Sequence, residues 1–392
     1  MLDAGGNARA ARNDRPGESD GAPAAREEAT IRAGTAPTGR PRVAFVYRKW
    51  PPAMGGMETY AFRLAAELEP HAEVERLVLP GHSDGSVPRP AEMLRFGLAA
   101  GARLLFSPAP APVVHVADMA SWPLAFCARI RRPGCRVLLS AHGTDVSYSA
   151  RGGLRGRLYG AYLRLGARLL TGATVLANSA ATARRAAAHG FAQVEVIPLA
   201  AEIEARPRRV PRRAVLFPGR LIRLKGCRWF IDEVLPRLPD EITLDVAGTV
   251  WDRDEEVALA HPRVRYLGKL DRPALAQACA DALCVVLPNI EMADGTFEGF
   301  GLVGVEAAAA GGVVLGSNHG GIPEAVLDGR TGILLPSGDA RAWAAQIEEI
   351  AGWSEERRAG FVARAQDVCD RHFTWSRVGR ETAARYRPKA AR

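Results

Sequence analysis

Short apolar runs alternate along this chain with longer stretches whose apolar residues have helical spacing. The first run, residues 43–47, predicts a strand, and residues 58–68 predict a helix after a turn rich in proline and glycine. Five further runs predict strands: 74–79, 113–116, 137–140, 173–177 and 194–198. Strands that alternate with helices form parallel sheets, so residues 41–203 are predicted to form a doubly wound α/β domain.

The alternation restarts after residues 204–213, a basic segment punctuated by prolines that is predicted to be a linker. Further strands are predicted at 214–217, 243–247, 264–266, 283–287 and 313–315, and a helix at 340–350. Residues 214–370 are therefore predicted to form a second doubly wound domain, followed by a last helix within 371–388. A ligand is expected in a cleft between the domains, at the carboxyl ends of the strands.

Residues 1–40 differ from the rest because they contain almost no large apolar side chain. Such a segment cannot bury enough surface to offset the entropy of the chain, so a disordered tail is predicted. The remainder is long enough for two cores, since 47% of the 392 residues are hydrophobic and 24% are charged.

Composition also favours a cytoplasmic protein. No apolar run of about 18 residues is free of charge, and the first residues include no apolar signal region, so neither a membrane span nor a leader is expected. The six cysteines form no C-x-x-C pair, which predicts buried free thiols and no zinc site.

Two carboxylates, Glu298 and Glu306, are separated by seven residues across a glycine-rich turn. The apolar pattern places the first on a loop and the second about one turn into a helix over residues 302–310. A carboxylate can accept hydrogen bonds from two neighbouring hydroxyls, while a helix N-terminus presents free N–H groups to an anion. Carboxylates that bind sugar hydroxyls, next to a helix end that binds phosphate, predict a nucleotide sugar as ligand.

Three further motifs lie where predicted strands end, and each has a simpler interpretation. Gly55 and Gly56 form either a tight turn or a bare backbone that phosphate can approach. His142 is either a core histidine or an exposed site residue beside a glycine. Arg220 and Lys225 are either solvated surface charges or the groups that bind a diphosphate, with the planar guanidinium donating two hydrogen bonds and the ammonium group supplying a compact charge. The functional interpretation is favoured for all three.

Taken in order with the Gly-Gly-x-Pro-Glu turn at 320–324, these motifs resemble the retaining glycosyltransferases of the GT-B fold, family four, over residues 42–388. The resemblance implies two Rossmann-like domains, the first binding the acceptor and the second the donor, and a C-terminal helix that crosses back. It implies a nucleotide-diphosphate sugar as co-substrate, with no cofactor and no metal. The catalytic residues that it implies are His142, Glu298, Arg220 and Lys225. The implied donor-binding residues are Gly55, Gly56, Arg220, Lys225, Gly248, Lys269, Leu270, Glu298, Phe300, Gly301, Leu302, Val303 and Glu306.

The expected function is retaining, metal-independent transfer of a sugar to a glycan or lipid-linked glycan of a bacterial-type cell-surface polysaccharide. One alternative is a dinucleotide-binding oxidoreductase, because residues 299–304 satisfy G-x-G-x-x-G, although ten residues separate the preceding strand from Glu298. Another is a non-catalytic sugar-nucleotide binding protein on the same fold. The D-x-D pattern of Asp252 and Asp254 is interpreted as a solvated acidic loop.

The net charge of +9 favours an anionic partner. Arginines interleave with apolar residues over 151–169, which predicts a helix with one apolar stripe and a basic flank. This helix either packs into the first domain or docks on anionic lipid near a lipid-linked acceptor, attaching the protein to the inner face of the membrane. Nucleic acid is not expected, because no recognition motif of aromatic and basic residues accompanies the charge.

Overall fold

The computed structural model describes residues 39–51, 56–82, 86, 88–201, 204–208 and 213–387. The chain divides into two units, Met1–Gly39 and Arg40–Arg392, and every helix and strand described here belongs to the second. The tail predicted for residues 1–40 lies, except for its last two residues, outside the described residues.

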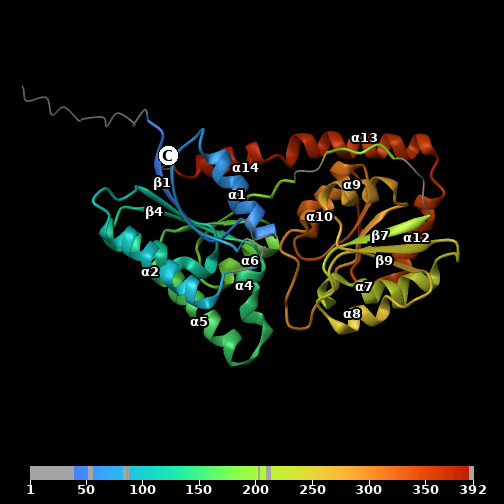
Figure 1. The fold of residues 1–392 in the computed structure, drawn as a ribbon, viewed down its shortest axis with the longest axis horizontal. Helices are drawn as coiled ribbons and strands as arrows, with labels where there is room; N and C mark the ends of the chain where they lie inside the picture. The colour runs from blue at the N-terminus through green and yellow to red at the C-terminus, as the bar shows by residue number, and fades with distance from the viewer. Residues whose placement is uncertain are drawn as a thin grey trace, which may run out of the picture. The chain divides into compact units, whose positions relative to one another are not determined.

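The first half of the second unit is built on a sheet of six parallel strands in the order β2-β1-β3-β4-β5-β6. Figure 1 labels two of these strands, β1 and β4, together with helices of this half. The strands are β1 (Arg42–Trp50), β2 (Glu73–Pro80), β3 (Val113–Val116), β4 (Arg136–Ala141), β5 (Thr174–Ala177) and β6 (Gln193–Val196). The α-helices of this half are α1 (Gly56–Leu68), α2 (Pro90–Phe106), α3 (Trp122–Arg131), α4 (Thr144–Ser147), α5 (Gly153–Leu169) and α6 (Ala180–Ala188).

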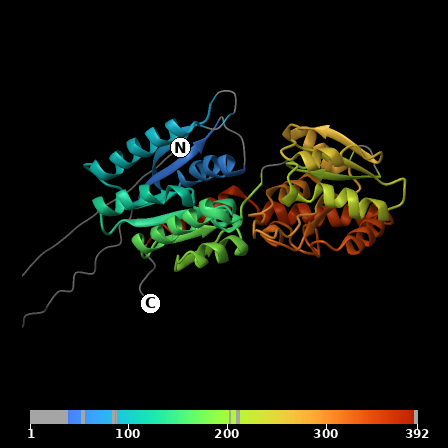
Figure 2. The same cartoon turned by 90° about the horizontal axis from the view of Figure 1, so that it is seen from below.

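Strand β1 shows how this sheet is buried on both faces. Its side chains alternate, so Phe45 and Tyr47 pack in the core that includes α1, whereas Ala44 and Val46 pack with α2, α3 and α5. Figure 2 shows the helices and strands of this half from a second side. A parallel sheet covered by helices on both faces needs such continuous apolar strands.

The second half repeats this architecture with parallel strands in the order β12-β11-β10-β7-β8-β9. The strands are β7 (Ala214–Pro218), β8 (Thr243–Ala247), β9 (Val264–Gly268), β10 (Val285–Leu287), β11 (Val314–Ser317) and β12 (Ile333–Leu335). The α-helices are α7 (Cys227–Trp229), α8 (Arg253–Ala258), α9 (Arg272–Asp281), α10 (Leu302–Ala310), α11 (Ile322–Ala325), α12 (Ala340–Ala351), α13 (Glu355–His372) and α14 (Trp375–Ala384). Strand β12 and helix α13 were not predicted from the sequence.

Helix α14 returns to the first sheet, as expected. The Arg377 guanidinium donates to the carbonyl oxygen of Pro198 at 2.6 Å, and the hydroxyl of Tyr386 lies 2.8 Å from Nδ1 of His115. The predicted fold class, two Rossmann-like domains and a C-terminal helix that crosses back, is confirmed. The domain limits stay a prediction, and part of the predicted linker lies outside the described residues.

Two composition-based expectations can be compared with the structure. The six cysteines are free thiols, and all except the half-buried Cys127 are buried, so their predicted burial is confirmed for five. No helix in the described ranges is both long and apolar enough to cross a membrane.

The buried histidine under α14 gives the fold a pH dependence. His115 is fully buried, with its two ring nitrogens 2.8 Å from Tyr386 Oη and from Ser140 Oγ. Burial, together with the nearby His142, lowers the pKa of His115 to about 3. In the unfolded chain His115 binds a proton near pH 6.5, whereas in the folded protein it does so only near pH 3. The contribution of His115 to the free energy of unfolding therefore decreases as the pH falls from 6.5 toward 3.

We therefore expect the free energy of unfolding to fall over this range, with His115 contributing up to about 1.4 kcal/mol per pH unit. Urea unfolding of the wild type and of His115→Gln at pH 6.5, 5.5 and 4.5 measures this. The variant is expected to be less stable at pH 6.5 but to lose stability more slowly. Equal slopes for the two proteins would show that the folded His115 accepts a proton.

Candidate active site

A cavity of about 570 Å³ lies where strands of both sheets end. Its wall includes residues that follow β4, β5 and β7, and the loop that leads into α10. Open parallel sheets bind ligands at this end of their strands, so the predicted location of the ligand agrees with the cavity.

The two halves touch at a contact between Gly143 and Gly299. A Cβ atom on Gly143, whose φ is 97°, would lie 2.5 Å from the Cα of Gly299, and a Cβ on Gly299 would overlap the carbonyl oxygen of His142. The hydroxyl of Thr182 in α6 also donates to the carbonyl oxygen of Gly299 at 3.4 Å. Only glycines allow this approach, which places His142 and Glu298 in the wall of one cavity.

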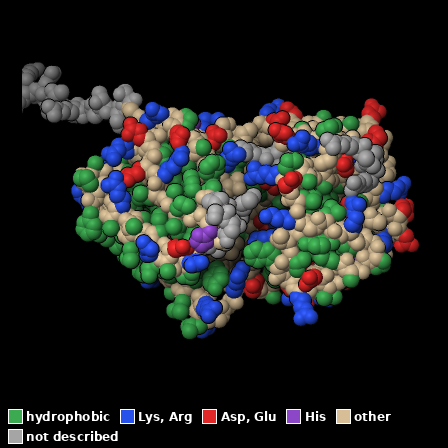
Figure 3. Space-filling model, viewed as in Figure 1, with side chains coloured by type: hydrophobic (Ala, Val, Ile, Leu, Met, Phe, Trp, Pro, Cys, Tyr) green, Lys and Arg blue, Asp and Glu red, His purple; other side chains and the backbone are tan. Residues whose placement is uncertain are grey.

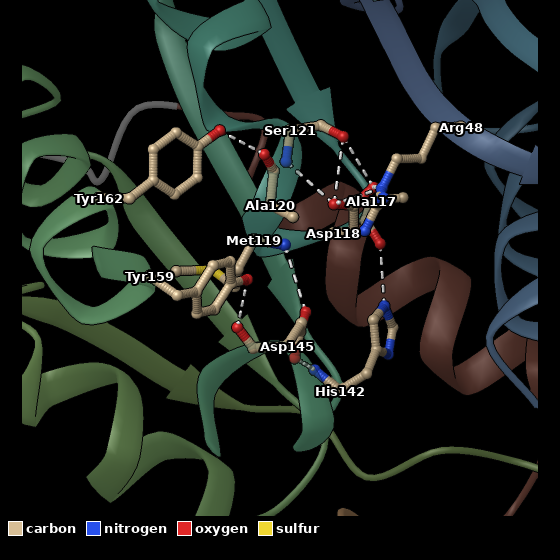
Figure 4. Close-up of polar contacts among 10 residues, drawn as sticks. All are labelled: Arg48, Ala117, Asp118, Met119, Ala120, Ser121, His142, Asp145, Tyr159 and Tyr162. Carbon is tan, nitrogen blue, oxygen red and sulfur yellow. Dashed lines mark hydrogen bonds and ion pairs between the residues drawn. The ribbon is translucent and has the colours of Figure 1, made fainter. Parts of the chain in front are cut away.

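His142 is fixed by its neighbours, although its side chain is buried and not exposed as the sequence analysis favoured. Its Nε2–H donates to the carbonyl oxygen of Ala117 at 2.9 Å (Figure 4), and the ring of Tyr60 packs against it with a centroid distance of 4.6 Å. Because a carbonyl only accepts, a neutral His142 keeps Nδ1 as an acceptor. The residue is thus both a satisfied histidine and part of the cavity wall.

A buried polar network, not foreseen from the sequence, holds the loops after β3 and β4 (Figure 4). The carboxylate of Asp145 accepts the backbone N–H of His142 at 2.8 Å and that of Met119 at 3.2 Å. Burial raises the pKa of Asp145, and these N–H donors together with His142 oppose the shift. Asp118 accepts from Arg48 at 3.2 Å. The network fixes the direction of His142.

Lys225 and Glu298 form an ion pair, with 2.7 Å between Nζ and Oε2. Burial alone would raise the pKa of Glu298, but the charges of Lys225 and Arg220 and the backbone N–H of Gly301 outweigh it and lower that pKa. Arg220 lies in the cavity wall and over the ring of Trp251, 5.3 Å from its centroid. The sequence analysis expected Lys225 and Glu298 to hold different parts of a donor, and in the structure they form an ion pair with each other.

Glu306 lies in α10 and has a different environment from Glu298. Burial raises its pKa, and the charges of Arg272 and Lys225 only partly oppose this shift. The remaining predicted residues divide by position. Those in the cavity wall are His142, Arg220, Glu298, Phe300, Gly301 and Leu302. Those that do not line it are Lys225, Gly248, Lys269, Leu270, Val303 and Glu306. Gly56 begins α1, and Gly55 lies outside the described residues.

Asn178 is a wall residue that the sequence analysis missed. It is 5% exposed, and its Oδ1 atom has no hydrogen-bond partner in the described part of the chain. The sequence feature that could have indicated it is its position directly after the strand predicted at 173–177. His142 has the equivalent position after the preceding strand. A buried acceptor without a partner in the protein is open to a hydrogen bond from a water molecule or a ligand.

The acidic pattern at Asp252 and Asp254 serves the fold. Asp252 caps α8 by accepting the backbone N–H of Asp254 at 3.0 Å. Within the described ranges, no group of three or more His, Cys, Asp or Glu side chains is arranged to hold a metal ion.

Known proteins resemble this chain both in sequence and in fold. The family model "Glycosyltransferase Family 4" matches residues 54–205, and "Glycosyl transferases group 1" matches residues 212–352. The D-inositol 3-phosphate glycosyltransferase of a Nocardioides species is 32% identical over 158 residues, which are 40% of this chain and 30% of that protein. The glycogen synthase of Mycobacterium tuberculosis is 35% identical over 191 residues, 46% of this chain and 44% of that protein.

The chain thus matches less than half the length of these two relatives. A solved structure, HepE of Anabaena in complex with UDP-glucose, matches with a TM-score of 0.64 at 18% identity, covering 88% of this chain and 99% of that one. That similarity concerns the fold alone, whereas the two family models match the amino-acid sequence itself. The chain belongs to glycosyltransferase family 4, the group 1 glycosyltransferases.

Proposed function

We propose that this protein is a retaining, metal-independent glycosyltransferase that uses a nucleotide-diphosphate sugar. The acceptor is a glycan or lipid-linked glycan of a bacterial-type cell-surface polysaccharide. The observation that carries the proposal is the cluster of Arg220, Lys225 and Glu298 at the cavity, because it combines cations for a diphosphate with a carboxylate for sugar hydroxyls. HepE, which shares the fold, was solved with UDP-glucose.

The donor position follows from this cluster. Arg220 and the N-terminus of α10 at Leu302 both border the cavity, so a diphosphate there meets a guanidinium fork and free N–H groups. Lys225 reaches the same region through its contact with Glu298. The sugar of the donor then lies toward His142, across the glycine contact.

The scarcity of carboxylates in the cavity wall argues against a retaining mechanism through a covalent intermediate. Apart from Glu298, the described wall of the cavity contains one carboxylate, Asp294, which accepts the N–H of Thr296 at 2.9 Å in its own loop, and this bond lowers its pKa. A double displacement needs a nucleophile and an acid that flank the reacting carbon. The leaving diphosphate is therefore the base, taking the acceptor proton on the face from which it departs, while Arg220 and Lys225 stabilise its charge.

The alternatives receive less support. The G-x-G-x-x-G pattern at residues 299–304 follows a loop that begins at Pro288, whereas a dinucleotide fingerprint directly follows its strand. A non-catalytic sugar-nucleotide binding protein would not require the ordered His142 beside the donor position. Both alternatives are tested by the measurements below.

Removal of either cation is expected to slow turnover. Arg220→Gln or Lys225→Gln should lower the rate of nucleoside diphosphate release about a hundredfold, because each charge stabilises the leaving group by about 3 kcal/mol. The donor is first selected by a thermal-shift panel of UDP-, GDP- and ADP-sugars. The exposed Arg237→Gln in the same half is the matched control. Wild-type rates in both site variants would refute the assignment.

The stereochemistry is the second test. An α-linked nucleotide sugar should give an α-product, at the same rate in excess EDTA, because protein cations and a helix end supply the positive charge. Proton NMR of the anomeric coupling in the glycoside product measures the outcome. A β-product, or activity lost to EDTA and restored by manganese, would exclude this mechanism.

We further propose that the protein attaches peripherally to an anionic membrane through α2 and α5. Helix α5 packs on the first domain through small residues, since Gly156, Gly160 and Gly166 are buried, while Leu154 and Leu158 are 72% and 60% exposed. The helix thus packs into the first domain, as one of the two interpretations had it, while Leu154 and Leu158 of its apolar stripe face solvent.

Helix α2 extends the same apolar face. Leu94, Leu98 and Phe106 are exposed on it, and Figure 3 shows hydrophobic side chains gathered with Lys and Arg over α2 and α5. Residues 153–169 contain four arginines and no acidic residue. Apolar side chains surrounded by arginines fit the interface of an anionic bilayer.

Leu154→Ser combined with Leu158→Ser should lower partitioning onto phosphatidylglycerol-containing vesicles at least tenfold, since each leucine loses more than 1 kcal/mol of apolar transfer free energy. Sedimentation with these vesicles and with neutral ones measures the effect. Val257→Ser, which removes an exposed apolar side chain from α8, is the control. Unchanged partitioning of the double variant would rule out this surface.

A further inference from the structure

We propose that a second cavity beside the donor site binds an anionic substituent of the acceptor, a phosphate or a carboxylate. This cavity has a volume of about 370 Å³ and lies between α6 and the loops that follow β10 and β11. It shares the wall residues Met292, Thr296 and Phe297 with the first cavity. The inference rests on the proposed transfer reaction for the identity of the ligand as the acceptor.

The charge of this cavity favours an anion. Arg184 and Arg185 of α6 and His319 contribute to its wall, against a single carboxylate, Glu291. Neither arginine forms an ion pair within the described ranges. Both arginines border the same cavity, so an anion bound there would be attracted to both.

Arg185 is oriented without being neutralised. Its Nη2 donates to the backbone carbonyl oxygen of Gly295 at 3.1 Å. Gly295 has a φ of 68°, and a Cβ atom there would lie 2.7 Å from the same nitrogen. The glycine therefore lets the loop after β10 hold the guanidinium through a neutral acceptor, and the rest of the fork stays available. A guanidinium fork matches phosphate and carboxylate oxygens in pairs.

The position of the cavity identifies the bound group as part of the acceptor. The cations expected to hold the donor diphosphate, Arg220 and Lys225, do not line this cavity. Phe297, which separates the two cavities, directly precedes Glu298 in the chain. A sugar in the second cavity would thus approach the donor sugar past Phe297, and Arg184 with Arg185 would select acceptors that carry negative charge.

Direct binding to the full chain tests this inference without knowledge of the natural acceptor. The probes are glucose 6-phosphate, glucuronate and glucose, titrated with and without a saturating nucleoside diphosphate. At least one of the two anionic sugars should bind and glucose should not. Arg184→Gln and Arg185→Gln should each raise its Kd about tenfold, since a hydrogen bond to a charged group contributes roughly that factor. The affinity for the nucleotide should not change.

Arg341→Gln, which alters an arginine of α12 outside both cavities, is the matched control and should bind like the wild type. Preference for glucose 6-phosphate over glucuronate identifies phosphate as the group, and the reverse preference identifies carboxylate. The inference is overturned if glucose binds as tightly as both anionic sugars, or if both α6 variants retain wild-type affinity for them. Failure of the proposed function shows separately, as an absence of nucleotide binding to the same protein.

Discussion

The contact between Gly143 and Gly299 is the constraint on which both cavities depend. It joins the end of β4 to the loop before α10, and neither position has room for a side chain. On one side of the contact, His142 and Glu298 border the larger cavity, and on the other, α6 reaches the loop after β10 through Arg185 and Gly295. A methyl group at this contact would separate the backbones and so displace both sites together.

Glu298 and Glu306, the two carboxylates separated by seven residues, have pKa values that their surroundings shift in opposite directions. Glu298 contacts Lys225 directly and its pKa is lowered despite burial, whereas Glu306 has only more distant cations and its pKa is raised. Glu298 is therefore held as an anion, which can accept hydrogen bonds but not donate them. A donor diphosphate that draws Lys225 toward itself would weaken the ion pair and leave Glu298 free for sugar hydroxyls.

The sequence predicted the fold better than it predicted the contacts. Parallel strands that are buried on both faces give a strong apolar signal, and α10 spans the predicted residues 302–310. Strand β12 has three residues and lacks such a signal. The periodicity of α5 correctly indicated an amphipathic helix but not its orientation. Its glycine side faces the domain because Trp122 fills that space, with the position of a Cβ on Gly166 only 2.9 Å from the indole.

Cavity residues were predictable where a motif was recognised, as for His142 and Arg220 at the ends of strands and Glu298 on the loop before α10, which all line the cavity. Asn178 occupies an equivalent position but carries no motif, so its side chain was not distinguished. The arginines of α6 were not recognisable either, because their cavity is completed by Gly295, more than a hundred residues away in the chain. The periodicity of apolar residues describes one helix or strand at a time, whereas the wall of this cavity is formed by α6 and two loops.

The net charge of +9 also acquires a structural meaning, because its cations do not form one uniform patch. Lys225 already has a carboxylate partner, Arg185 has only a neutral carbonyl oxygen, and the α5 arginines at 155, 157, 164 and 168 are exposed to solvent. If the proposals hold, Lys225 exchanges its carboxylate for a diphosphate and Arg185 gains an anion. The α5 arginines would then meet a diffuse surface charge that salt screens. The proposed contacts with donor, acceptor and membrane would therefore use separate cations of one basic chain.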